Sequence, residues 1–86
     1  MKQVIMMTKD GCGSCTTFKP IAKQIADEYG YEFKIVPNPK VNVPFFPFFF
    51  IMDEGKVIQQ WGGTQERKYR SVLKRISKQS QKNQDG

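Results

Sequence analysis

The sequence predicts one α/β domain in which helices flank a small, mixed, four-stranded sheet. Two observations lead to this prediction. Apolar runs at residues 3–8 and 31–36 enclose a stretch of helical periodicity, which is the pattern of a βαβ unit with parallel strands. Two further apolar runs, at 48–52 and 56–61, are separated by a short turn that ends at Gly55, as in an antiparallel hairpin. A chain of 86 residues supplies one such domain with a modest core.

The first strand and the first helix have clear signals. Residues 3–8 form an apolar run that ends in a Lys-Asp-Gly turn, as a buried strand entering a loop would. From residue 13 to 29, apolar side chains recur every three or four positions, and Gly30 provides a C-terminal stop. Pro20 lies inside this pattern and lacks a backbone donor, so we expect the helix to kink there and continue.

The remaining elements complete the sheet and add a second helix. Residues 31–36 alternate and are rich in aromatic and branched side chains, which favours a strand. The run 48–52 is apolar on both faces, as in a central strand, and 56–61 is its hairpin partner. After a glycine pair, Thr64 is the candidate N-cap of a helix whose apolar face is formed by Tyr69, Val72, Leu73 and Ile76.

The C-terminal stretch differs in composition from the rest of the chain. Residues 79–86 contain no apolar side chain, so we expect a disordered polar tail after a domain at residues 1–78. Residues 64–86 hold seven of the 14 basic residues and two acidic ones, hence five of the six net positive charges. This positive charge could bind an acidic partner, glutathione or nucleic acid. Alternatively, the basic residues only form a solvent-exposed face of a helix. No nucleic-acid-binding motif is present.

The chain has two cysteines, Cys12 and Cys15, and no histidine. A disulfide between them would close almost no loop in the unfolded chain, so it would add little stability. Structural zinc usually takes four Cys or His ligands, so a metal site here would need carboxylates or a second subunit. We therefore expect thiol chemistry with no bound metal or other cofactor.

The first ten residues do not resemble a signal peptide or a membrane span, because charge returns after only a few apolar positions. We therefore expect a cytoplasmic protein that does not enter the membrane. A reducing compartment keeps ordinary thiols reduced, so a closely spaced pair of cysteines is more often catalytic than structural there.

Around these cysteines the sequence resembles the thioredoxin and glutaredoxin superfamily, over about residues 2–78. The motif CGSC is followed by a proline inside the helix, in the segment PIAKQIADEY, and both features are similar to thioredoxins. The lead-in VIMMTKDGC and the GGT at 62–64 resemble glutaredoxins instead. The resemblance implies a thioredoxin-like fold and a redox-active disulfide between Cys12 and Cys15.

The resemblance also implies a cis-proline that faces the cysteines. Its spacing to Gly55 assigns it to Pro47, which follows Phe46. Pro44 is the rival position, although Pro47 would then interrupt the central strand, and both prolines could instead simply end a loop. Thioredoxins have a helix before this proline, but only the segment PNPKVNVPFF stands here, so we expect that helix to be reduced or absent.

The expected roles of the cysteines follow from their place at the first turn of the helix. Unpaired N–H groups there favour the thiolate of Cys12, and Lys9 could add a second favourable charge, unless it is only a solvated lysine. Cys12 would attack a substrate disulfide, and Cys15, one turn deeper, would resolve the mixed disulfide.

Other positions of the motif depart from thioredoxins. Gly13 permits close approach of a substrate backbone, whereas Ser14 replaces a proline and Gly11 a tryptophan. Met6 stands where thioredoxins keep a buried aspartate that helps to deprotonate the second cysteine. In this chain water or another group must accept the proton of Cys15, and Asp10 is the nearest acid in sequence.

Substrates and electron donors would meet this same surface. The backbone of Phe46, next to Pro47, is expected to pair with an extended substrate segment. By resemblance to glutaredoxins, Lys9 and the N–H groups of Gly63 and Thr64 would hold the carboxylates of glutathione. The thioredoxin-like helix segment favours thioredoxin reductase with NADPH over glutathione as the electron donor.

These features predict a thiol–disulfide oxidoreductase, a monomeric dithiol reductant of protein disulfides that serves electron transport and cell redox homeostasis. The alternative is a non-catalytic binding module of thioredoxin fold. Such a module would dock a larger enzyme or nucleic acid through the surface around Cys12 and Pro47, or through the basic helix.

Overall fold

The structure, a computed structural model, describes the backbone of residues 2–85 and the side chains of residues 2–77. Its elements follow the order β1 (Gln3–Thr8), α1 (Gly13–Glu28), β2 (Glu32–Pro37), β3 (Phe48–Asp53), β4 (Lys56–Gly62) and α2 (Glu66–Asp85). The predicted type and order of these elements are confirmed, and only their ends shift.

The strands form one mixed sheet in the order β2-β1-β3-β4. Strand β1 pairs in parallel with β2 and antiparallel with β3, and β3 pairs antiparallel with β4. The parallel pair joined by α1 is the predicted βαβ unit, and β3 with β4 is the predicted hairpin. The connection 38–47 contains no helix, so the helix that was expected to be reduced or absent is absent.

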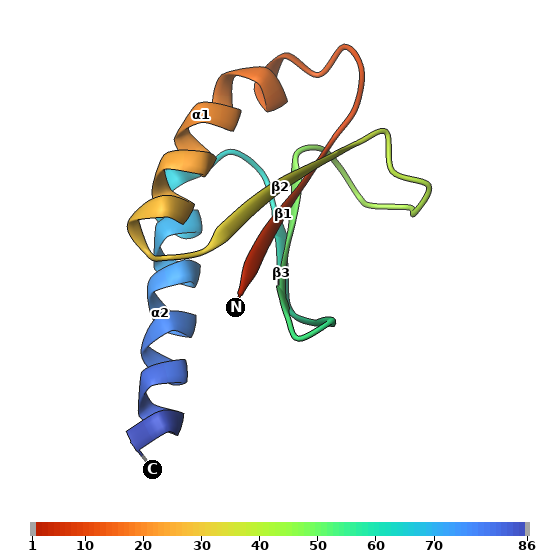
Figure 1. Ribbon diagram of the computed structural model, residues 1–86. Helices are drawn as coiled ribbons and strands as arrows, with labels where there is room; N and C mark the ends of the chain where they lie inside the picture. The colour runs from red at the N-terminus through yellow and green to blue at the C-terminus, as the bar shows by residue number, and fades with distance from the viewer. Residues whose placement is uncertain (1, 86) are drawn as a thin grey trace.

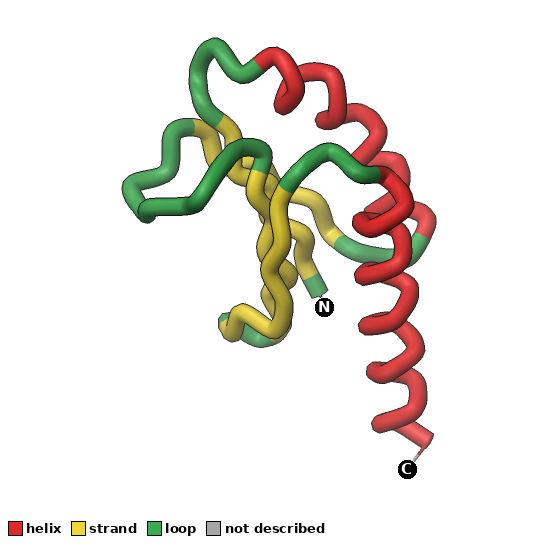
Figure 2. Tube along the Cα trace, turned by 180° about the vertical axis from the view of Figure 1, so that it is seen from behind, coloured by secondary structure: helices red, strands yellow, loops and turns green. Residues whose placement is uncertain are grey.

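Both helices pack on one side of the sheet, as Figure 1 shows, and Figure 2 shows the same arrangement from behind. Side chains of a strand alternate between its two faces, so each strand offers every second residue to the helices. Val4 and Met6 of β1 and Phe49 and Ile51 of β3 are the residues on this side, and all four are fully buried. The core therefore lies between one face of the sheet and the two helices.

Aromatic rings fill the part of this core that joins the hairpin to the helices. The ring of Phe49 stacks on Trp61, with centroids 5.3 Å apart, and Tyr69 of α2 lies 5.1 Å from Phe49. Phe18 of α1 contacts both Phe49 and Tyr69 edge-on. Such pairs add about 0.5–1.5 kcal/mol each beyond the burial of their area, so this cluster fixes both helices on the sheet.

Helix α1 continues through Pro20. This proline has no N–H, so the carbonyl of Thr16 lacks its usual partner four residues later. Figure 2 shows α1 curving along its length, which fits the loss of one helical hydrogen bond.

Helix α2 begins later than the sequence suggested. The Tyr69 N–H donates to the Gln65 carbonyl at 3.1 Å, so Gln65 stands at the cap position and the helix starts at Glu66. The assignment of Thr64 as N-cap is therefore wrong. Gly63, with φ 102°, turns the chain just before Thr64, and Thr64 still belongs to this bend.

Helix α2 also continues to Asp85, across the residues 79–85 where we expected a disordered tail. Residues 66–85 contain neither glycine nor proline, so no residue type there interrupts a helix. The side chains of 78–86 lie outside the described part, and a domain boundary at residue 78 stays a prediction. Within the described residues, no helix is long and apolar enough to cross a membrane.

Two buried tyrosine hydroxyls join the elements of the core. The Tyr69 O–H donates to the Ala22 carbonyl of α1 at 2.8 Å, and the Tyr31 O–H donates to the Leu73 carbonyl of α2 at 2.9 Å. Burial raises the pKa of both tyrosines above 10.0, because the charged phenolate would lose its water. Their protonated forms are therefore part of the folded structure.

Replacing Tyr69 by phenylalanine should make stability less sensitive to high pH. The folded state keeps the Tyr69 proton at pH values where the unfolded chain, with a pKa of 10.0, releases it. This contribution is complete below that pH and is lost as the pH rises above it. Urea unfolding from about pH 8 to 11 should show a smaller decline for Tyr69→Phe, although the variant loses about 1 kcal/mol with its hydrogen bond. Equal declines in both proteins would contradict this account.

Candidate active site

Cys12 is the N-cap residue of α1. Its backbone is extended, with φ −86° and ψ 97°, and its carbonyl accepts a helical hydrogen bond from the Thr16 N–H at 3.3 Å. Its sulfur accepts from the Cys15 N–H at 3.2 Å, and Ser14 Oγ lies 3.6 Å away. An N-cap side chain meets the unpaired N–H groups and the positive end of the helix. The geometry therefore favours a thiolate at Cys12 when the pair is reduced.

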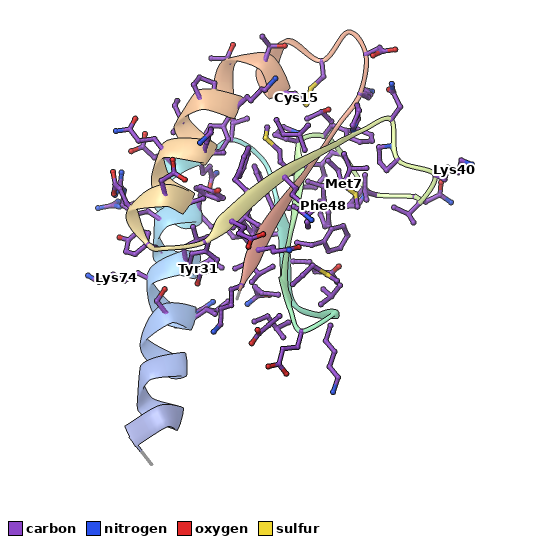
Figure 3. All side chains as sticks on the ribbon, viewed as in Figure 1. Met7, Cys15, Tyr31, Lys40, Phe48 and Lys74 are labelled. Carbon is purple, nitrogen blue, oxygen red and sulfur yellow. A yellow bond between two sulfur atoms is a disulfide. The ribbon has the colours of Figure 1, made fainter. Side chains whose placement is uncertain are left out.

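Cys12 and Cys15 form a disulfide, with Cα atoms 5.3 Å apart. Cys15 is 4% exposed and packs in the core, whereas Cys12 is half-buried. Figure 3 shows Cys15 at the first turn of α1. Of the two sulfurs, the one of Cys12 is thus the more open to a second molecule.

The loop before Cys12 is held by the turn that follows β2. Asn38 Oδ1 accepts from the Asp10 N–H at 3.0 Å, and the Asn38 N–H donates to the Thr8 carbonyl at 2.7 Å. Gly11 has φ 78°, a conformation that glycine adopts without strain. The position of Cys12 therefore depends on a residue of a different loop.

The Phe46–Pro47 peptide bond is cis, and the Pro47 side chain is fully buried. The Lys9 ammonium lies 5.4 Å from the centroid of the Phe46 ring, which is a cation–π contact. Among the described residues, the backbone N–H and carbonyl of Phe46 make no hydrogen bond. The structure thus brings Lys9 together with Phe46 and leaves backbone groups there free to pair.

A pocket opens beside the disulfide, between the loop before α1, the first turns of α1 and the end of β2. A side chain added at Gly13 would meet nothing within 4 Å, so a substrate backbone has room to approach there. The lining includes both cysteines, Lys9, Gly11, Gly13, Thr16, Lys19 and Ile35.

Ser14 Oγ lies close to the Cys12 sulfur, but neither Ser14 nor the Gly63-Thr64 turn lines this pocket. Ser14 and Thr64 line a second hollow, beside Phe18 and Ile21 of α1, and they do not line the pocket at the disulfide. The Gly63 N–H donates to the Pro47 carbonyl at 3.0 Å. This N–H is therefore already paired and is not free for a ligand carboxylate, contrary to the sequence interpretation.

Sequence reasoning missed several residues of this region, among them Lys19, Thr16, Ile35 and Asn38. Lys19 follows Cys15 by one helical turn, and Thr16 follows Cys12 in the same way, so the helical period could have placed both near the sulfurs. Asn38 gave no such signal, because its contact with Asp10 depends on the pairing of β1 with β2. Among the described side chains, no group of three acids or cysteines could hold a metal ion.

No family model and no curated protein sequence matches this chain. Solved thioredoxins match it in fold. The reduced thioredoxin preprotein of Schistosoma mansoni has a TM-score of 0.75 and 22% identity, over 86% of this chain and 77% of that one. Fasciola hepatica thioredoxin has a TM-score of 0.72 and 24% identity, over 86% and 79%. A chain from the complex of ferredoxin:thioredoxin reductase with thioredoxin f2 has 0.74 and 16%, over 87% and 76%.

These identities show a fold and no more. The chain has a thioredoxin-like fold, as the sequence resemblance implied, with a Cys-x-x-Cys disulfide at the start of its first helix.

A carboxylate at residue 6 should destabilise the core in a pH-dependent way. Met6 is fully buried, in the same core cluster as Cys15. In Met6→Asp, burial would raise the pKa of the carboxyl above its unfolded value of about 3.9, so the penalty is small below that pH and grows as the pH rises. Met6→Asn is the matched control, because its side chain does not titrate. Melting temperatures from about pH 4 to 8 should diverge; a constant difference between the variants would place residue 6 outside the core.

Proposed function

We propose that this protein is a thiol–disulfide oxidoreductase, a dithiol reductant of protein disulfides that cycles between a Cys12–Cys15 dithiol and a disulfide. One observation carries the proposal. The half-buried sulfur of Cys12 accepts a helix N-terminal N–H, and the sulfur of Cys15 is buried next to it within disulfide distance. The thioredoxin-like fold supports the same conclusion.

The reaction needs two exchange steps. The Cys12 thiolate attacks one sulfur of the substrate disulfide, forms a mixed disulfide and releases the other sulfur as a thiolate. The Cys15 thiolate then attacks Cys12 Sγ, which releases the second substrate thiol and leaves the Cys12–Cys15 disulfide. The substrate gains two electrons and two protons, and the protein loses them. The division of labour follows from access, since Cys15 is too buried to meet a large substrate first.

The substrate would bind beside the disulfide as an extended segment. The free N–H and carbonyl of Phe46 can add such a segment as a short strand, next to Pro47. Lys9 on the Phe46 ring places a positive charge at this surface, and Gly13 leaves space for the approaching backbone. Ser14 and Thr64 flank the site from the second hollow.

The electron donor we favour is a thioredoxin reductase supplied by NADPH. A structural neighbour comes from a complex of thioredoxin f2 with ferredoxin:thioredoxin reductase, which supports a reductase as the partner but says nothing of NADPH. Glutathione is less favoured because the Gly63 N–H, one of its expected contacts, is already paired. Either donor requires a reducing compartment such as the cytoplasm.

Serine substitutions should separate the roles of the two cysteines. The wild-type protein should accelerate the reduction of insulin by dithiothreitol. Cys12→Ser should lose this acceleration, because the attacking sulfur is gone, and insulin should then be reduced at the rate of dithiothreitol alone. Cys15→Ser should still attack but should stall as a mixed disulfide, so mass spectrometry should find substrate attached to Cys12. Substrates trapped on Cys15 in Cys12→Ser, and none in the reverse variant, would overturn this assignment. A wild-type protein that leaves the insulin rate unchanged would favour the binding module.

Equal concentrations of the oxidised protein are offered to each reductant, and dithiol formation is followed by thiol labelling. Reduction should be faster with thioredoxin reductase and NADPH than with glutathione at physiological levels. The slower reaction with glutathione should fall about fivefold in Lys9→Ala, as expected for loss of an exposed charge contact of about 1 kcal/mol. Lys56→Ala, an exposed lysine of the β3–β4 hairpin, is the matched control and should have no effect. Faster reduction by glutathione would reverse the order of donors, and an unaffected Lys9→Ala would remove this lysine from the site.

A further inference from the structure

The surroundings of Cys15 work against the chemistry that the resolving step asks of it. The thiolate is the nucleophile in disulfide exchange, so Cys15 must lose its proton before it can attack. Cys15 is 4% exposed, and burial in apolar surroundings disfavours the charged form of a thiol. Among the described residues no charged side chain is buried, and Met6 in the same core cluster is apolar. Besides the cysteines, the titratable members of this cluster are the phenols of Tyr29, Tyr31 and Tyr69.

Lys19 follows Cys15 by one turn of α1. At about 100° per residue, four residues bring the chain round by about 400°, so the two side chains leave the helix within about 40° of each other. Side chains of a helix lean towards its N-terminus, which carries Lys19 back over the turn that holds Cys15. Both residues line the pocket beside the disulfide. The helical period and the pocket therefore place Lys19 on the same side of α1 as the resolving sulfur.

Lys19 is also the lysine of this pocket that other contacts leave free to act. The charged residues that line the pocket are Lys9, Asp10 and Lys19, and the lining residues from β1 and β2 are uncharged. Lys9 lies over the Phe46 ring. Lys19 takes part in none of the ion pairs among the described side chains. Two lysines against one aspartate leave the lining with one surplus positive charge.

We propose that Lys19 stabilises the thiolate of Cys15 during the resolving step. The proposal rests on the proposed function, in which Cys15 attacks Cys12 Sγ of a mixed disulfide. The Cys15 proton passes to solvent water in the open pocket, while Lys19 keeps its own proton and supplies a fixed positive charge. The Cys15 sulfur then forms a bond to Cys12 Sγ, and the bond from that atom to the substrate sulfur breaks. The substrate leaves with the electron pair as a thiolate and takes up a proton from water.

Two other groups of the site suit this task less well. The helix N-terminus serves Cys12, since the Cys15 N–H donates to the Cys12 sulfur. Asp10 lines the pocket, but its negative charge opposes a thiolate nearby. A carboxylate is also a poor acceptor for this proton, because carboxyl groups titrate near pH 4 and thiols near pH 8.5. Lys19 is thus the lining residue whose charge has the right sign and whose place on α1 is next to Cys15.

The variant Cys12→Ser allows the proposal to be tested without any redox reaction. It leaves Cys15 as the only thiol of the chain, next to a neutral cap residue, as in the mixed disulfide. The Cβ chemical shift of ¹³C-labelled cysteine then follows ionisation of this thiol as the pH changes. Adding Lys19→Gln should move the midpoint of the titration higher by about one pH unit, the lower end of the effect of a nearby opposite charge, since Lys19 is exposed. Lys19→Arg keeps the charge and should keep the midpoint within about 0.3 pH unit.

Two further variants in the same background serve as controls. Lys23→Gln makes the same change one turn further along α1, at a lysine that pairs with Asp27 and does not line this pocket. It should leave the midpoint unchanged. Asp10→Asn removes a negative charge from the lining, so it should move the midpoint slightly lower, in the direction opposite to Lys19→Gln.

The resolving step itself can be timed in the protein with both cysteines. The reduced protein releases two thiopyridone molecules from 4,4′-dithiodipyridine, one when Cys12 attacks and one when Cys15 resolves, and stopped-flow absorbance separates the two phases. At pH 7, Lys19→Gln should slow the second phase about threefold, because about tenfold less thiolate is partly offset by its greater nucleophilicity. The difference should vanish and then reverse as the pH rises above both midpoints. The first phase should change less than about twofold.

An unchanged midpoint in Lys19→Gln would overturn the proposal. So would equal shifts in Lys19→Gln and Lys19→Arg, because the effect would then follow the shape of the side chain and not its charge. The proposed function is judged separately, by insulin reduction. A protein that reduces insulin but shows no shift in Lys19→Gln loses only the role of Lys19. A protein that shows the shift but does not accelerate insulin reduction loses only the proposed function.

Discussion

The hydrogen bond from the Cys15 N–H to the Cys12 sulfur is the contact on which the site depends. It exists because Cys12 is the last extended residue before α1 and Cys15 is the third residue of the helix. The same spacing puts one sulfur at the surface and the other in the core, so two thiols of one type acquire different access. Helix geometry, more than any single neighbouring charge, thus gives the two sulfurs the different access that the proposed attacking and resolving roles need.

Because no helix connects β2 to β3, the sheet is covered on one side only. Residues 38–47 connect the strands directly, and both helices pack on one side. The core is therefore one layer deep, closed by the stacked rings of Phe49 and Trp61 and by Tyr69 of α2. The side of the sheet away from the helices carries the apolar residues Ile5, Met7 and Phe50, and no helix of the described residues covers it.

The surface around the disulfide combines features of two kinds of oxidoreductase without the complete set of either. Lys9 contacts the Phe46 ring, but the Gly63 N–H is occupied by the Pro47 carbonyl. A protein partner can bind through the free backbone of Phe46 and a broad contact area, so its affinity depends little on any single N–H donor. Glutathione is small, and the loss of one donor such as the Gly63 N–H weakens its binding more. This difference is the physical reason for preferring protein substrates and a protein reductant.

The sequence alone determined the elements, their order and the place of the cysteines, because hydrophobic periodicity and the N-terminal position in a helix are local properties. It selected Pro47 over Pro44 through the need for an uninterrupted central strand. It did not place Asn38 against Asp10, pair the Gly63 N–H with Pro47, or start α2 at Glu66. Nor did it show which face of the sheet both helices leave open. These features join residues far apart in the chain or depend on a backbone turn, so only the tertiary structure decided them.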